Sequence, residues 1–163
     1  MASNLRNLSI EEGLPVTLTK EYSVGIIVSE YNSHITYALR DACIETLEAH
    51  GVRDIYVDYA PGAFELPLAA KLLHDNIPVQ AVIAFGCVIK GDTEHDVYIN
   101  QAVAKALMDL NLSENKPFVF GLLTVNNEQQ ALDRAGGLHG NKGTECALAA
   151  LKMLSLNERL EKV

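Results

Sequence analysis

Short apolar runs alternate along the chain with longer stretches in which apolar residues recur with the period of a helix. The apolar runs predict strands at residues 23–28, 54–59, 81–85 and 117–123. The periodic stretches predict helices at 33–50, 64–74, 96–111, 127–135 and from 143 to near the C-terminus. Such an alternation predicts a parallel sheet with right-handed crossovers and helices on both faces.

Residues that typically begin or end helices support these boundaries. Either Asn32 or Ser33 is expected to cap the first helix with its side chain, and Gly51 to end that helix in the left-handed conformation. Pro67 is compatible with the second helix because it falls in the first turn.

The first 20 residues lack such a period and contain Pro15, so residues 1–20 predict an N-terminal arm. Residues 21–163 predict one domain, as expected for a chain of 163 residues. An arm of this kind can add a strand to a neighbouring subunit. The sequence shows neither an apolar span long enough for a membrane nor the start of a signal peptide, which predicts a soluble, cytoplasmic protein.

Composition narrows the choice of partners. A formal net charge of −8 argues against nucleic acid or an anionic membrane, because both require basic patches. Any anionic substrate must therefore be bound by local dipoles and a few cations. Cys43, Cys87 and Cys146 are far apart and lie among apolar or small residues, so they predict reduced thiols in the core and no metal site.

Candidate chemistry gathers after the third predicted strand, in a polar loop at residues 86–96. Open α/β sheets bind ligands at the carboxyl ends of their strands. The imidazole of His95 can transfer protons near neutral pH, although a lone histidine can equally be structural or merely exposed. The other histidines favour ordinary positions at helix ends or in a loop: His34, His50, His74 and His139.

A turn at Gly91-Asp92-Thr93 resembles an anion cradle, in which backbone amides and the Thr93 hydroxyl can meet a phosphate. Asp92 must then face away, because its carboxylate repels phosphate. Arg134 can supply the missing cation. The alternatives are a common glycine turn and a surface arginine at a helix C-terminus.

A second strand end carries Glu65 in the first turn of a helix, after a Pro-Gly turn. Its carboxylate can accept hydrogen bonds from polyol hydroxyls, or it can simply interact with the helix dipole. Tyr31, just past the first strand, can stack on a flat heterocycle, or it can be an exposed loop tyrosine.

Several motifs in this order resemble those of 6,7-dimethyl-8-ribityllumazine synthases, and the likeness extends from about residue 23 to residue 154. The motifs are PGAFELP at 61–67, GCVIKGDTEH at 86–95, FGLLT at 120–124, QALDRAG at 130–136 and GNKG at 140–143.

This resemblance implies a flavodoxin-like three-layer α-β-α sandwich with a central four-stranded parallel sheet. It also implies the penultimate step of riboflavin biosynthesis. In that step 5-amino-6-(D-ribitylamino)uracil condenses with L-3,4-dihydroxy-2-butanone 4-phosphate, and phosphate and water leave. The family uses neither a metal nor an organic cofactor.

The resemblance assigns roles residue by residue. The pyrimidine and its ribityl chain would be bound by Tyr31, Ala63, Phe64, Glu65, Val88, Ile89 and Phe120. The butanone phosphate would be bound by Gly91, Asp92, Thr93 and Arg134. Phe120 and Arg134 would come from a neighbouring subunit, Lys142 matches the lysine of GNKG, and His95 matches the proton-transfer residue.

Two departures stand out against the family pattern. Relatives commonly follow the histidine with an aromatic residue and then a carboxylate, whereas here Asp96 follows directly and Val97 takes the acidic place. The carboxylate that would orient His95 is therefore open. Leu138 replaces a residue that is often polar or basic, which weakens the positive potential near the phosphate.

Rival functions share this fold. A non-catalytic flavin- or lumazine-binding module would need neither His95 nor Arg134, so that pair favours an enzyme. A receiver-type signalling domain would need an acidic pair after the first strand, which is not found.

The resembling family forms pentamers and hollow shells of sixty subunits, which can enclose riboflavin synthase. A purely architectural shell subunit is a third possibility, and one compatible with catalysis. The short loop at 136–140 favours the shell, whereas the arm with Pro15 could block it.

Overall fold

A four-stranded parallel sheet forms the centre of the computed structural model, which describes residues 7, 9, 13 and 15–162. The strands lie in the order β2-β1-β3-β4, and every neighbouring pair is parallel. Their bounds are β1 (Ser23–Ser29), β2 (Asp54–Ala60), β3 (Ala81–Ile89) and β4 (Phe118–Val125). The parallel sheet predicted from the apolar runs is therefore confirmed.

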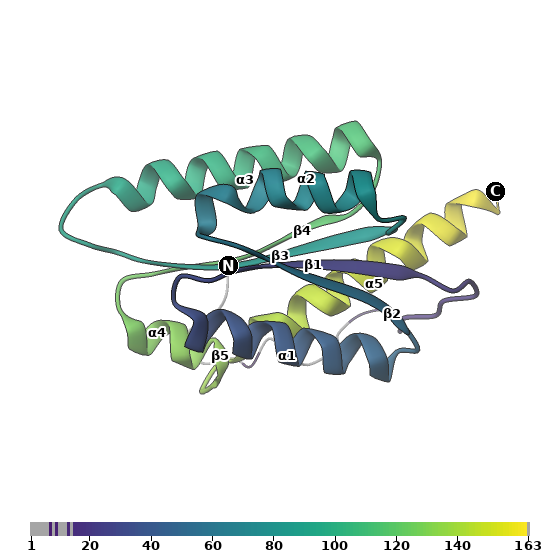
Figure 1. Cartoon of the computed structure of the whole chain (residues 1–163). Helices are drawn as coiled ribbons and strands as arrows, with labels where there is room; N and C mark the ends of the chain where they lie inside the picture. The colour runs from purple at the N-terminus through teal and green to yellow at the C-terminus, as the bar shows by residue number, and fades with distance from the viewer. Residues whose placement is uncertain (1–6, 8, 10–12, 14, 163) are drawn as a thin grey trace.

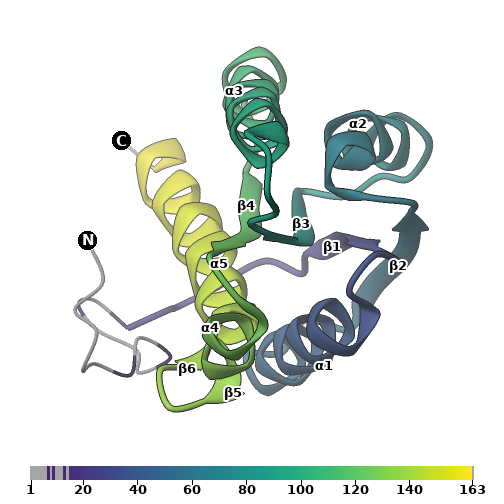
Figure 2. The ribbon, with the colours of Figure 1, turned by 90° about the vertical axis from the view of Figure 1, so that its left-hand side faces the viewer.

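Helices cover both faces of this sheet (Figures 1 and 2). One face carries α2 (Leu66–Asn76) and α3 (His95–Glu114), and the other carries α1 (Ser33–Ala49), α4 (Glu128–Asp133) and α5 (Lys142–Glu161). Each face buries its own apolar cluster, because a parallel sheet must be covered on both sides. The architecture is the flavodoxin-like three-layer sandwich that the family resemblance implied.

The third strand is longer than predicted. We expected a loop from Gly86, but β3 continues to Ile89 and pairs with residues 122–125 of β4. A side chain at Gly86 would approach Leu122 Cδ1 within 2.7 Å and Leu66 Cδ1 within 2.9 Å, so this glycine marks tight packing inside a strand and not a turn. The polar loop is thereby shortened to about residues 90–94.

A small hairpin was not predicted. Strands β5 (Ala135–Gly137) and β6 (Gly140–Asn141) are antiparallel and join α4 to α5, where the sequence indicated the end of a helix and a glycine break. Gly136 and Gly140 have φ angles of 108° and 83°, which favour glycine. Gly51 likewise ends α1 with a φ of 88°, as predicted.

The three cysteines are buried and unbonded, as expected of core thiols. Burial raises the pKa of Cys87 to about 11 and that of Cys146 to about 12, which keeps both thiols protonated. Among the helices of the described residues, none is long and apolar enough to span a membrane.

Much of the predicted arm, residues 1–6, 8, 10–12 and 14, lies outside the described residues. Residues 15–19 form no strand and lie against α5, where the buried Glu158 accepts hydrogen bonds from the Thr19 hydroxyl (2.8 Å), the Tyr22 hydroxyl (2.9 Å) and the Lys20 amide (3.1 Å). Burial alone raises the pKa of Glu158, but these bonds outweigh it and lower the pKa to about 2. Strand addition by the rest of the arm stays a prediction.

Candidate active site

Most of the predicted site residues follow the carboxyl ends of three neighbouring strands. Tyr31 lies just after β1, η1 (Ala63–Glu65) follows β2, and β3 ends at Ile89 before the loop to His95, the first residue of α3. Because the strands are parallel, these ends meet at one edge of the sheet. We call the following residues the strand-end group: Tyr31, Ala63, Phe64, Glu65, Val88, Ile89, Gly91, Asp92, Thr93 and His95.

The corner between β1 and β2 is held by short contacts. The Tyr31 amide donates to the Pro61 carbonyl over 3.1 Å, and the Gly62 amide donates to the Glu65 carboxylate over 3.2 Å. A Cβ atom at Gly62 would come within 2.8 Å of the Tyr31 ring, so only glycine lets the ring lie there. Tyr31 is 68% exposed, which leaves an open aromatic surface beside the Glu65 carboxylate.

The two residues between Gly62 and Glu65 differ in exposure. Phe64 is 59% exposed, whereas Ala63 is buried. Ala63 can therefore meet a ligand mainly through its backbone.

Asn32 does not act as the sequence suggested. It precedes α1, but its side chain makes no capping hydrogen bond and its backbone is left-handed, with φ 57° and ψ 43°. Its amide Nδ2 instead donates to the Cys87 carbonyl of β3 over 3.0 Å. The first helix therefore begins without the predicted side-chain cap.

The loop that carries His95 is open. Its residues from Gly91 to His95 are exposed, and the His95 amide donates only a long bond, 3.4 Å, to the Thr93 hydroxyl. Within the described part of the chain, the side chains of Asp92 and His95 make no hydrogen bond or ion pair. A Cβ atom at Gly91 would meet nothing within 4 Å, so crowding inside the chain does not require glycine there. Anion binding by this turn stays a prediction.

No carboxylate of the described residues orients His95. The neighbouring Asp96 turns one oxygen, Oδ1, into the protein, where it is buried without a hydrogen-bond partner.

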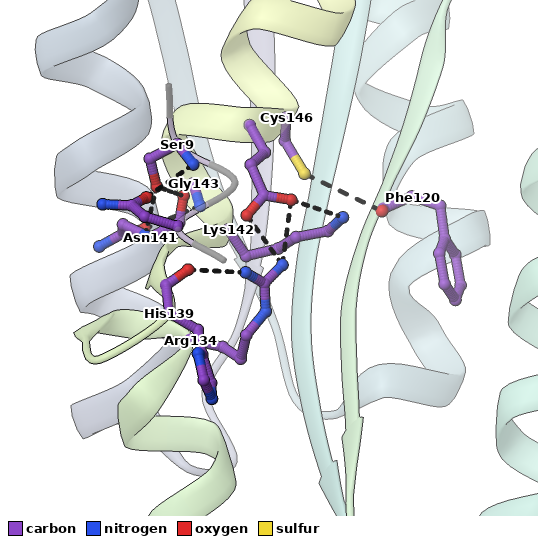
Figure 3. A network of polar contacts seen from close by, with 10 residues as sticks. Ser9, Phe120, Arg134, His139, Asn141, Lys142, Gly143 and Cys146 are labelled. Carbon is purple, nitrogen blue, oxygen red and sulfur yellow. Dashed lines mark hydrogen bonds and ion pairs between the residues drawn. The ribbon is translucent and has the colours of Figure 1, made fainter. Parts of the chain in front are cut away.

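Arg134 is no surface arginine, because its side chain is only 17% exposed. It caps the C-terminus of α4, and its guanidinium donates to the His139 carbonyl (3.0 Å) and pairs with Glu145 (2.8 Å), as Figure 3 shows. Lys142, the first residue of α5, also pairs with Glu145, over 3.3 Å. Two cations share one carboxylate, so the network keeps a surplus positive charge that can attract an anion.

Glu145 was not predicted as part of the site. Its spacing of three residues from Lys142 on a helix was the available signal, since such pairs face each other. Its contact with Arg134 depends on the β5–β6 hairpin, which the sequence did not indicate.

Phe120 lies on the edge strand β4, away from the ends of β1 and β2. Its carbonyl faces the Cys146 thiol, beside the Arg134 network, and its ring points away from that network (Figure 3). We call Phe120, Arg134 and Lys142 the cation group. In the described part of the chain, no hydrogen bond or ion pair joins the cation group to the strand-end group.

Two cavities lie elsewhere. One, of about 580 Å³, lies between residues 20–22 and the C-terminal ends of α3 and α5, and the other, of about 420 Å³, lies between β2 and α2. Neither is lined by a predicted site residue. The strand-end group therefore lies at the surface, at the carboxyl ends of the strands, and outside both cavities.

The chain is similar over most of its length to one family of known proteins. The family described as 6,7-dimethyl-8-ribityllumazine synthase matches residues 21–158. A protein of that name from Porphyromonas gingivalis is 46% identical over 158 residues, which cover 96% of this chain and 98% of the relative. Another, from Parabacteroides distasonis, is 43% identical over 159 residues, which cover 96% of this chain and 99% of the relative. A relative of the same name from Phocaeicola vulgatus is 43% identical and covers 99% of this chain.

Proposed function

The chain belongs to the 6,7-dimethyl-8-ribityllumazine synthase family, and we propose that residues of its strand-end group and of its cation group together bind that reaction's substrates. The chain is a transferase of riboflavin biosynthesis. It condenses 5-amino-6-(D-ribitylamino)uracil with L-3,4-dihydroxy-2-butanone 4-phosphate to give 6,7-dimethyl-8-ribityllumazine, phosphate and water. The assignment of individual residues below is the proposal.

The pyrimidine binds at the corner between β1 and β2. The open ring of Tyr31 stacks on the flat heterocycle. The Glu65 carboxylate and the backbone at Ala63 hold the ribityl hydroxyls, while Phe64, Val88 and Ile89 contribute apolar surface. This assignment is supported by the position of both side chains at Gly62: the Tyr31 ring packs against this glycine, and the Glu65 carboxylate accepts a hydrogen bond from its amide.

The phosphate binds to Arg134 and Lys142 of the cation group and to the turn at Gly91-Asp92-Thr93, while Phe120 lines the ring pocket of the pyrimidine. Arg134 is suited to this task because a guanidinium forms two parallel bonds to phosphate oxygens. Lys142 adds a second positive charge, and Glu145 holds both cations in place. Thr93 donates its hydroxyl, while Asp92 turns its carboxylate away.

The reaction proceeds by amine attack on the ketone, loss of water to give an imine, and removal of a proton that lets phosphate leave. Ring closure and a second loss of water complete the product. His95 shuttles these protons, a role worth about 10²–10⁴-fold in rate. Much of the remaining acceleration comes from holding the amine against the ketone, because both substrates are already reactive.

The two groups belong to different subunits in each complete site. Phe120 and Arg134 of one chain face the strand-end group of its neighbour, which accounts for the missing contacts between the groups within a single chain. The working unit is therefore a closed oligomer, which the family resemblance puts at five subunits. The short connection between β5 and β6 favours further assembly into a sixty-subunit shell, one able to enclose riboflavin synthase.

The observation that carries the proposal is the family match over residues 21–158 combined with the exposed Tyr31 ring beside Glu65. The test mixes the purified protein with both substrates and follows the absorbance of the lumazine product, while light scattering gives the particle mass. Product formation by an oligomer supports the proposal. Tight binding of a lumazine without turnover would instead support a non-catalytic binding module.

A further inference from the structure

We propose that Asn32 is a positioning residue that fixes the Tyr31 ring relative to the end of β3, and so sets the width of the slot for the pyrimidine. The inference rests on the function proposed above. It deepens that function, because nothing in the sequence motifs gives Asn32 a role beyond capping a helix.

The backbone of Asn32 is unusual. Among the described residues other than glycine, only Asn32 and Asn115 have positive φ angles, 57° and 50°. Asparagine adopts the left-handed region more readily than most residues with a side chain. Such a conformation persists where the surrounding contacts hold the residue in place. The Asn32 carbonyl accepts from the Ile35 amide over 2.9 Å and so starts α1 directly after Tyr31.

The side chain of Asn32 bridges two strands that no longer pair. The ladder between β1 and β3 ends where Val28 meets Phe85. Two residues further along β3, the Cys87 carbonyl accepts the Asn32 amide over 3.0 Å. This bond extends the link between the two strands beyond the ladder, and the next residues of β3 are Val88 and Ile89.

Tyr31 is therefore tied on two sides. Its own amide is bonded to Pro61 and its ring lies on Gly62, which fixes it toward β2. The bond from Asn32 to Cys87 fixes the adjacent residue toward β3. Without that bond, the ring stays on Gly62 but loses its fixed separation from the apolar residues that would face the other side of the heterocycle.

Two substitutions separate the backbone from the side chain. Asn32→Gly keeps the left-handed backbone but removes the amide. Asn32→Asp keeps the size of the side chain, and aspartate also tolerates the left-handed backbone, but the substitution places a carboxylate against the Cys87 carbonyl. Matched controls are Asn115→Gly and Asn115→Asp, because Asn115 has the same backbone conformation at the far end of α3.

The first experiment measures steady-state kinetics with each substrate varied in turn. We expect both Asn32 variants to raise the KM for the pyrimidine by about 5–20-fold, the size expected for one lost hydrogen bond near the ligand. The KM for the butanone phosphate and the kcat should change by less than about twofold, and the Asn115 variants should match the wild type. Equal behaviour of the Asn32 and Asn115 variants would overturn the proposal.

A second experiment asks whether Asn32 acts through Tyr31. In a Tyr31→Ala background, adding Asn32→Asp should leave the pyrimidine KM unchanged, because the ring it positions is gone. Multiplied effects would contradict the inference. If Asn32→Gly does not fold, the Asn32→Asp variant carries both tests alone. A wild-type protein that makes no lumazine overturns the proposed function itself, whereas an active wild type with normal Asn32 variants overturns only this inference.

Discussion

Arg134 and His95 are both expected to meet charge during the reaction, and the protein holds them in opposite ways. The guanidinium of Arg134 is largely buried, bonded to His139 and paired with Glu145. The imidazole of His95 is exposed at the start of α3 and makes no hydrogen bond or ion pair in the described part of the chain. The guanidinium is therefore held in place by contacts within the chain, whereas no hydrogen bond or ion pair of the described residues holds the imidazole.

This difference follows from the cost of burial. A buried charge without a partner is strongly destabilising, so a guanidinium at this depth needs Glu145. An exposed imidazole stays solvated and needs no partner. Loss of Arg134 should therefore damage structure and function together, while loss of His95 should damage function alone.

The largest effect is expected for Arg134→Ala. The ratio kcat/KM for the butanone phosphate should fall by roughly 100–1,000-fold, because a forked, charge-assisted pair of hydrogen bonds to phosphate is lost. Binding of the pyrimidine should change little. Steady-state kinetics with each substrate varied gives the answer, and an equal loss for both substrates, or for neither, would show that Arg134 does not bind the phosphate.

Two controls sharpen this result. Arg134→Lys should restore activity only in part, because an ammonium cannot form the planar fork. The double variant with Arg134→Ala and Glu145→Gln should recover part of the lost stability, because Glu145 keeps only Lys142 as a partner once Arg134 is gone, yet remain inactive. Recovery of activity in the double variant would mean that Arg134 serves the fold alone.

His95→Ala should lower kcat by about 10–1,000-fold, because proton transfer is lost while positioning remains. Thermal unfolding and particle mass should match the wild type, since the imidazole is exposed and makes no hydrogen bond or ion pair in the described part of the chain. An unchanged kcat would remove His95 from the mechanism, and a large loss of stability would break the contrast with Arg134.

The smallest effect concerns Glu158, a second buried and fully bonded charge. Its pKa of about 2 in the folded chain lies below the ordinary value of 4.5, so its contribution to stability is present above pH 4.5 and is lost as the pH falls from 4.5 toward 2. Glu158→Gln should therefore be less stable than the wild type near neutral pH, and the difference should shrink below pH 4.5. Urea unfolding of both proteins across this pH range measures it, and a difference independent of pH would contradict the account.

Elements with a clear period could be predicted from the sequence, as could turns with one demanding residue. The four strands, the major helices and the left-handed Gly51 are examples. Strand-end positions followed from this pattern, which is why Tyr31, Glu65 and His95 fall at one edge of the sheet.

Features that depend on packing between distant segments were missed. Gly86 was predicted to begin a loop, but it lies inside β3, where Leu66 and Leu122 leave no room for a side chain. The partnership of Glu145 with Arg134 requires a hairpin of strands too short to show a period. Asn32 is of a residue type that often caps helices, and only its hydrogen bond to the Cys87 carbonyl of β3 shows that its side chain does something else.

The central claim, that each site joins the strand-end group of one chain to the cation group of another, is tested most directly by mixing two inactive variants. His95→Ala and Arg134→Ala chains are unfolded, combined in equal amounts and refolded together, with each variant alone as control. A shared site predicts that activity rises to roughly a quarter of the wild-type value, because about one interface in four then joins an intact His95 to an intact Arg134. Activity that stays at the average of the two separate variants, in mixed oligomers of the correct mass, would contradict the claim.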